Sequence, residues 1–154
     1  LALDGQPGPW CPPGVEVVDQ GTGELGHRLA AAWSHVDGPT VQIGMDTPQV
    51  TGEVLNRSLD AVVDGAAAVL GPADDGGWWL LGLRRPHPGA FEGVPWSAPG
   101  TCAAQRDRLV QLGLAVTWDV PLRDVDHWGD ALAVAAMTPD RAFAQAVERA
   151  EATR

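Results

Sequence analysis

The segment Gly71-Pro72-Ala73-Asp74-Asp75-Gly76-Gly77 lies between two apolar runs, Ala66 to Leu70 and Trp78 to Leu83. Apolar runs of this length are typical of buried strands. The proline, the paired aspartates and the paired glycines between them predict a tight acidic loop at a strand end. Ligands bind at strand ends in open α/β sheets, and we therefore expect this loop to line a ligand site.

Two further segments place aspartates at expected strand ends. Asp46 falls just past the end of an expected buried strand at residues 40–44, and Asp124 and Asp126 are two positions apart. In an extended segment, residues two apart point to the same side, so both carboxylates can face one site. Together with the loop at residues 71–77, these aspartates indicate a site for Mg²⁺ or Mn²⁺, which bind carboxylate oxygens alongside substrate phosphates.

Each acidic segment also has a structural interpretation that the sequence leaves open. A lone aspartate such as Asp46 commonly caps a helix or forms a turn. Asp126 is placed to cap a helix expected near Trp128, and residues 74–77 match a solvated hairpin turn of the Asp-Gly type. The metal site and these structural roles are both compatible with the sequence.

The composition excludes several classes of function. A net charge of −10 opposes binding to a nucleic-acid backbone. All ten basic residues are arginines, which excludes Schiff-base chemistry and a phosphate-loop lysine. Cys11 and Cys102 match no zinc-binding spacing and are expected to be free thiols in a cytoplasmic protein. No apolar run approaches the ~20 residues of a membrane helix, so no membrane association is expected.

The alternation of strand and helix patterns predicts one α/β domain over residues 1–154, with a mostly parallel sheet flanked by helices. Strands are expected at residues 1–3, 15–18, 40–44, 66–70, 78–83 and 114–120. Helices are expected at residues 25–36, 52–64, 102–112 and 128–136, and after Thr138-Pro139. Thr51 and Thr101 are the expected N-caps of the second and third helices.

A glycine-rich helix entry is a candidate for substrate contacts. Gly21, Gly23 and Gly26 match the spacing of a dinucleotide fingerprint. The chain has no acidic ribose partner at the expected distance in a βαβ unit, so a nicotinamide dinucleotide site is not expected. The helix entry still predicts an anion contact near Gly26, with Arg28 one turn further along. A surface salt bridge accounts for Arg28 equally well.

Trp96 is the best candidate among the seven tryptophans for stacking against a ligand. It lies in the proline-rich segment from Arg84 to Pro99, which is too irregular for a helix and is expected to form a lid or to cover an edge. Packing in the hydrophobic core is the alternative for this side chain.

The chain begins at Leu1, inside an expected strand and without a methionine. We therefore expect that a first strand of the sheet is missing. A sheet without that strand would expose unpaired backbone groups along one edge. This edge predicts self-association, with a homodimer as the simplest form.

Four motifs in order resemble the DUF2064 family: Gly23 to Leu29, Gly44 to Pro48, Gly71 to Leu83, and Asp124-Val125-Asp126. The family is similar to glycosyltransferase-A (GT-A) proteins, is related to nucleotidyltransferases and is assigned in part to arsenosugar-type glycosyltransferases. The resemblance covers essentially the whole chain and implies a Rossmann-like nucleotide-diphospho-sugar transferase (GT-A) fold. His127 departs from the family pattern, in which a threonine is common at this position.

The resemblance also implies roles for individual residues. Asp46 and Asp126 would be the catalytic, metal-binding aspartates, with Asp124 as a further ligand of Mg²⁺ or Mn²⁺. Asp74, Asp75, Gly76 and Gly77 would line the acceptor or sugar side. The implied function is metal-dependent glycosyl or nucleotidyl transfer from a nucleotide-diphospho-sugar. The alternatives are a non-catalytic domain that binds or self-assembles, and a metal-dependent phosphohydrolase.

Overall fold

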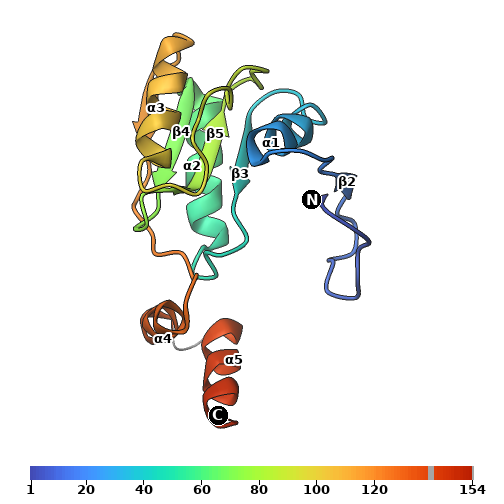
Figure 1. Ribbon diagram of the computed structural model, residues 1–154, viewed down its shortest axis with the longest axis vertical. Helices are drawn as coiled ribbons and strands as arrows, with labels where there is room; N and C mark the ends of the chain where they lie inside the picture. The colour runs from blue at the N-terminus through green and yellow to red at the C-terminus, as the bar shows by residue number, and fades with distance from the viewer. Residues whose placement is uncertain (139–140, 154) are drawn as a thin grey trace.

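A four-stranded sheet with helices on both faces forms the centre of the protein (Figure 1). The structure is a computed structural model that describes residues 1–138 and 141–153. The strands are β1 (Ala2–Leu3), β2 (Val18–Asp19), β3 (Thr40–Ile43), β4 (Ala68–Pro72), β5 (Trp78–Leu83) and β6 (Val116–Trp118). The helices are α1 (Leu25–Trp33), α2 (Gly52–Asp64), α3 (Thr101–Gln111), α4 (Trp128–Met137) and α5 (Ala142–Glu151).

The central sheet has the order β3-β5-β4-β6, and three of its strands run in one direction. The exception is β5, which is antiparallel to both of its neighbours, β3 and β4. The loop at residues 73–77 is too short for the crossover that a parallel pair requires, so β5 must return beside β4 in the opposite direction. The expected α/β fold is confirmed, and the mostly parallel sheet is interrupted by this one reversed strand.

Alternation along β4 and β5 divides the core between the two faces of the sheet. Leu70, Leu81 and Leu83 are fully buried on the face covered by α1, α3 and the segment at residues 84–100. Val69 and Leu80 are buried on the opposite face, where α2 packs through Val62 and its neighbours. The near-continuous apolar runs in the sequence therefore reflect strands that are buried on both faces.

A β-bulge at the end of this strand pair separates the two adjacent tryptophans. Gly71 pairs with Leu80 and Pro72 pairs with Trp78, which leaves Trp79 as the extra residue. The Trp79 ring packs in the core beneath α2, whereas Trp78 packs on the opposite face. A Cβ atom on Gly71 would lie 2.6 Å from the Trp79 ring, so the bulge requires glycine at this position.

Some of the helix N-caps expected from the sequence are present in the structure, and others are not. The Thr51 hydroxyl accepts a hydrogen bond from the Val54 N–H at 3.1 Å, which confirms it as the N-cap of α2. The expected cap at Thr101 is wrong, because α3 begins with this residue and its hydroxyl donates to the carbonyls of Pro95 and Ala98. Likewise, α4 is capped by His127, whose N–H donates to the Asp130 carboxylate, and Asp126 takes no part in the cap.

Two small units flank the central sheet. Strands β1 and β2 form a separate parallel pair near the N-terminus, and α4 and α5 form a packed helix pair that projects beyond the end of the sheet (Figure 1). Arg141 fastens this helix pair by donating to the Val50 carbonyl at 2.9 Å. The expected helix start at Thr138-Pro139 involves Pro139, which lies outside the described residues. None of the helices in the described part of the chain has the length and apolar character needed to cross a lipid bilayer.

Leu81→Ala should lower the free energy of unfolding by about 2–5 kcal/mol, because a fully buried side chain is removed from the packed face of the sheet. The matched control is Val110→Ala on α3, whose side chain is exposed and whose replacement should change stability by less than about 0.5 kcal/mol. Urea unfolding followed by circular dichroism measures both. Equal effects of the two substitutions would contradict the described core.

Candidate functional site

Three carboxylates meet at the end of the central sheet. Asp75, Asp124 and Asp126 each offer one oxygen, and these oxygens all lie within 4.8 Å of one another. Asp75 belongs to the loop between β4 and β5, and the other two belong to the segment between β6 and α4. We refer to these three residues as the acidic cluster. Residues about fifty positions apart in the sequence are thus brought to one point.

Backbone hydrogen bonds hold the two halves of the acidic cluster together. The Leu122 N–H donates to the Pro72 carbonyl at 3.1 Å, and the Asp74 N–H donates to the Leu122 carbonyl at 3.0 Å. These bonds continue the pairing of β4 with β6 as a parallel bridge between Ala73 and Leu122. The segment carrying Asp124 and Asp126 therefore leaves the sheet directly beside the acidic loop.

Asp46 lies next to the acidic cluster. Its carbonyl accepts a hydrogen bond from the Val125 N–H at 2.9 Å, which joins the loop after β3 to the segment between Asp124 and Asp126. The Gln49 amide on the same loop donates to the Arg123 carbonyl. The three segments singled out in the sequence therefore do converge. The closest three carboxylates include Asp75, which the resemblance assigned to the substrate side, whereas Asp46 stands beside them.

Like charges dominate this region. Burial raises the pKa of Asp124, and the neighbouring charges of Asp75, Asp126 and Asp46 raise it further. Arg123 is close by, but it pairs with Asp74 at 3.5 Å and with Asp130 at 3.9 Å. Within residues 1–138 and 141–153, no ion pair neutralises Asp46 or the acidic cluster. A divalent cation would relieve this repulsion, because several carboxylate oxygens are its preferred ligands.

Two buried polar residues on the Asp46 loop were missed in the sequence. Thr47 is 5% exposed, and its hydroxyl has no hydrogen-bond partner among the described residues. The side-chain oxygen of Gln49 is also buried without a partner in that part of the chain. Orphaned buried oxygens are costly and rare in folded proteins. The carboxylates of the acidic cluster are themselves the donors that suit Mg²⁺ or Mn²⁺ with its waters.

Gly76 and Gly77 shape the acidic loop. Gly76 has a φ of +92°, and a Cβ atom there would lie 2.0 Å from the Pro99 carbonyl oxygen, so a side chain is excluded. The Gly76 carbonyl accepts from the Cys102 N–H at 2.9 Å, and the Gly77 carbonyl accepts from the Ala73 N–H at 2.9 Å. The loop is therefore closed on itself and fastened to the start of α3, which orients the Asp75 side chain.

The structure gathers Trp96 and Gly26 in one packing contact. Trp96 packs against Trp78 and Phe91, with ring centroids 6.2 Å apart in each pair. A Cβ atom on Gly26 would lie 2.8 Å from the Trp96 indole nitrogen, so this glycine lets α1 approach the ring. These contacts favour the core-packing alternative for Trp96 and give Gly26 a structural role.

Arg28 lies one turn beyond Gly26 and contacts Gln20, whose side-chain oxygen accepts from Nη1 at 3.4 Å. Its Nε is buried and has no hydrogen-bond partner within the described residues. Across those same residues, no ion pair or hydrogen bond joins Arg28 to the acidic cluster. The anion contact at Gly26 and Arg28 stays a prediction.

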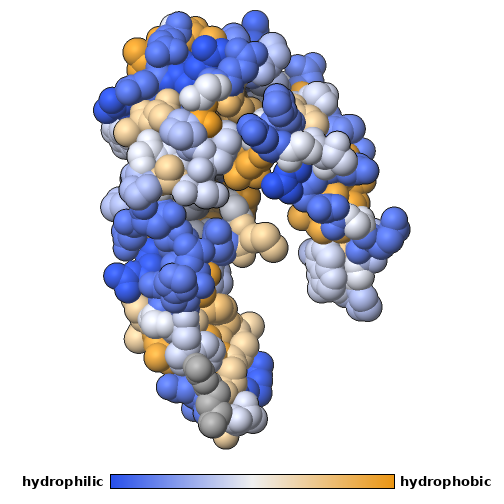
Figure 2. All heavy atoms as spheres, in the orientation of Figure 1, coloured by the Kyte–Doolittle hydropathy of each residue, from blue (hydrophilic) through white to orange (hydrophobic). Residues whose placement is uncertain are grey.

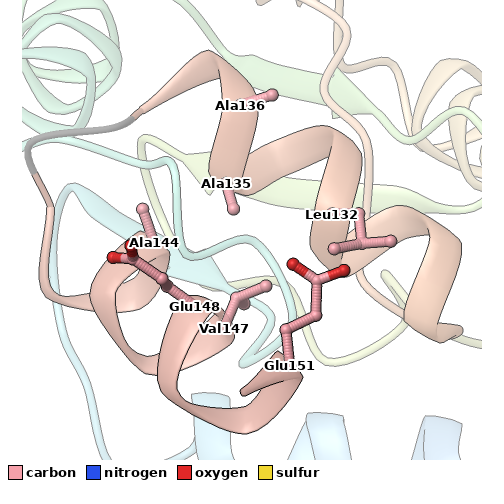
Figure 3. Close-up of a pocket in the computed structure, with 7 residues that line it drawn as sticks. All are labelled: Leu132, Ala135, Ala136, Ala144, Val147, Glu148 and Glu151. Atoms are coloured by element: carbon pink, nitrogen blue, oxygen red, sulfur yellow. The ribbon is translucent and has the colours of Figure 1, made fainter. Parts of the chain in front are cut away.

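A separate hollow of about 250 Å³ lies between α4 and α5 (Figure 3). The side chains of Leu132 and Ala135 on α4 face Val147 on α5, with Glu148 and Glu151 at the rim. Its lining includes no residue of the acidic cluster. The hollow reflects loose packing of small side chains between two helices, and it adds no chemistry to the candidate site.

Asp124→Asn should raise the melting temperature of the cation-free protein at neutral pH, because it removes one of the crowded charges. The raised pKa of Asp124 means that its charged form is the unfavourable one in the folded state, so the penalty exists above that pKa. As the pH falls through this pKa, the wild-type carboxyl takes up a proton and the advantage of the variant should disappear.

Thermal unfolding in EDTA, from neutral to acidic pH, measures this difference. Asp60→Asn is the matched control, since Asp60 is an exposed residue of α2. It should leave the melting temperature unchanged at neutral pH. An Asp124→Asn variant that is less stable than the wild type at neutral pH would show that the repulsion is absent.

Comparison with known proteins agrees with this architecture. A crystal structure from Desulfovibrio desulfuricans G20, described as a "putative nucleotide-diphospho-sugar transferase", matches with a TM-score of 0.79 at 23% identity. The match covers 94% of this chain and 66% of that one, so this chain spans just under two thirds of its length. The likeness confirms the fold expected from the sequence. No curated protein sequence matches the chain.

Residues 2–98 match the sequence family described as "Uncharacterized protein conserved in bacteria (DUF2064)". The matched region contains the Asp46 loop and the acidic loop at residues 73–77. The segment with Asp124 and Asp126 lies beyond the matched region. Because the family match spans more than half of the chain, this protein belongs to the DUF2064 family.

Proposed function

We propose that this protein is a metal-dependent transferase that acts on a nucleotide-diphospho-sugar, with Mg²⁺ or Mn²⁺ held by the acidic cluster. The observation that carries the proposal is the convergence of Asp75, Asp124 and Asp126 within 4.8 Å at the end of the sheet. The shared fold with a protein described as a nucleotide-diphospho-sugar transferase supports it. The two free thiols, Cys11 and Cys102, support a cytoplasmic location as part of the same proposal.

The charges around the acidic cluster explain why a cation is part of the proposal. A diphosphate is an anion, and it would be repelled by Asp46 and the three clustered carboxylates. Arg123 is already paired with Asp74 and Asp130, and the chain has no lysine. When bound, Mg²⁺ or Mn²⁺ supplies the positive charge that stabilises a diphosphate leaving group.

The residues of the chain then have distinct parts in this proposal. Asp75, Asp124 and Asp126 would ligate the cation, and Asp46 would contribute a fourth charge from the neighbouring loop. Gly76 and Gly77 would keep the acidic loop in the closed conformation that presents Asp75 to the bound ligand. Both glycosyl transfer and nucleotidyl transfer release a diphosphate-type group, and the arrangement of carboxylates serves either reaction.

The wild-type protein should bind Mn²⁺, and the double variant Asp124→Asn/Asp126→Asn should bind it roughly 100-fold more weakly or not at all, because two of three ligands lose their charge. Isothermal titration calorimetry measures both affinities. Uridine diphosphate, used as the nucleotide probe, should bind only when Mn²⁺ is present.

Asp60→Asn/Asp64→Asn removes two negative charges from exposed positions of α2, outside the acidic cluster, and should bind Mn²⁺ like the wild type. This control separates ligation from the loss of overall charge. Equal Mn²⁺ affinity of the wild type and the double variant would overturn the proposed cation site. Nucleotide binding that does not depend on Mn²⁺ would overturn the role assigned to the cation.

A second candidate function is self-assembly, and the open edge of β3 favours it. β3 is the edge strand of the central sheet on this side, and Ile43 at its end is 40% exposed. Met45, two residues further on, is fully exposed. An exposed edge strand with apolar side chains is a template for pairing with another strand, and a second copy of this chain offers the same edge.

Self-association predicts a dimer in light scattering coupled to size-exclusion chromatography. Ile43→Lys should shift the protein toward the monomer, because a charged side chain opposes pairing at an edge strand. Val110→Lys is the control, since Val110 is exposed on α3. A monomer at all accessible concentrations would exclude this second candidate.

A further inference from the structure

An open groove of about 450 Å³ lies beside the acidic loop. Its walls come from the end of β4, the acidic loop, the first half of α3 and the end of β6. The volume falls in the range of about 300–1,000 Å³ that is usual for small-molecule sites. The groove is separate from the hollow between α4 and α5, with which it shares no residue.

The groove and the acidic cluster share one stretch of backbone. Gly76 lines the groove, and the adjacent Asp75 belongs to the cluster. The Cys102 N–H holds the Gly76 carbonyl at 2.9 Å, and the Thr101 hydroxyl donates to the Pro95 carbonyl at 2.8 Å. The groove is therefore built by a fixed contact between the acidic loop and α3, and a molecule bound there lies next to the carboxylates.

The walls of the groove are apolar and include an aromatic surface. Pro72 and Pro99 contribute rigid apolar rings, and Trp118 at the end of β6 is 50% exposed. An indole that is half exposed in a groove offers a face for stacking against a flat molecule. Trp118 is half exposed because β6 is an edge strand of the central sheet.

Arg106 gives the groove its charge. Of the described residues that line the groove, Arg106 is the one that carries a charge. Its guanidinium pairs with Asp107, the next residue in the chain, and both side chains are about half exposed. An exposed ion pair between neighbours contributes little to stability, so the guanidinium is available to an anionic ligand. Arg106 is therefore the point in the groove at which a negative group of a ligand would bind.

We propose that the groove binds the second substrate of the transfer, and that this substrate is an aromatic carboxylate. Its ring lies against Trp118, its carboxylate pairs with Arg106, and its remaining end lies beside Gly76 next to the acidic cluster. The assignment as a second-substrate site rests on the proposed transferase function. The choice of ligand class rests on the exposed indole of Trp118 and the guanidinium of Arg106.

The test uses naphthalene-1-acetate as the probe, with the full chain and isothermal titration calorimetry. Arg106→Gln and Trp118→Ala should each weaken binding roughly tenfold, since one removes a charge-assisted contact and the other a stacking surface. The neutral analogue naphthalene-1-acetamide should bind the wild type roughly tenfold more weakly than the acid. Arg149→Gln, at an exposed arginine of α5, is the matched control and should bind the probe like the wild type.

Thermal unfolding of each variant checks that the fold is kept, which is expected because Arg106 and Trp118 are surface side chains. Failure of the wild type to bind the probe would overturn the groove as an aromatic carboxylate site. The assignment would also be overturned if Arg106→Gln and Trp118→Ala bound the probe as tightly as the wild type. Equal affinity of the wild type for the acid and the amide would overturn it too.

Two crossed measurements separate this inference from the proposed function. Arg106→Gln should bind Mn²⁺ like the wild type, and Asp124→Asn/Asp126→Asn should still bind the probe. If the wild type binds the probe in an Arg106-dependent manner but does not bind Mn²⁺, the proposed transferase site is refuted. The groove then remains a carboxylate site. Intact Mn²⁺ binding without probe binding would refute the groove alone.

Discussion

Backbone hydrogen bonds at the end of β4 hold the acidic loop against its two neighbouring segments. Pro72 and Asp74 bond to Leu122 on one side, and Gly76 bonds to Cys102 on the other. Each such bond contributes only about 1 kcal/mol to stability on balance. Their value lies in position, because they bring carboxylates from separate segments to short range, where no ion pair within the described residues neutralises Asp75, Asp124 or Asp126. Carboxylates placed in this way repel one another, and a bound cation would remove this electrostatic repulsion.

The fold was predictable from the sequence because its strands are buried on both faces. The apolar runs before and after residues 71–77 identify β4 and β5, and the short acidic loop between them forces an antiparallel return. The helix patterns around Thr51 and Gly65 give α2 with both of its ends. Boundaries that depend on tertiary contacts were less predictable, as the start of α3 shows. There the Thr101 hydroxyl bonds to the preceding loop instead of capping the helix.

The membership of the acidic cluster could not be read from local patterns. Asp75 joins Asp124 and Asp126 because Leu122 pairs beside Ala73, and this pairing links segments that are distant in the sequence. The adjacent aspartates Asp74 and Asp75 indicated in part which residue joins the cluster, because neighbouring side chains in an extended segment point in opposite directions. Trp96 shows the converse case, in which a tryptophan in an irregular segment suggests a ligand. In the structure, the Trp96 ring packs against α1, where it lies directly beside Gly26.

The bulge formed by Trp79 has a consequence for how this protein can vary. Because Trp79 packs over Gly71, the alignment of β4 with β5 is locked on the sheet side of the loop. Residues inserted into or deleted from the tip would therefore alter the loop without sliding one strand along the other. The residues of the loop tip can thus change in evolution without altering the hydrophobic core on either face of the sheet.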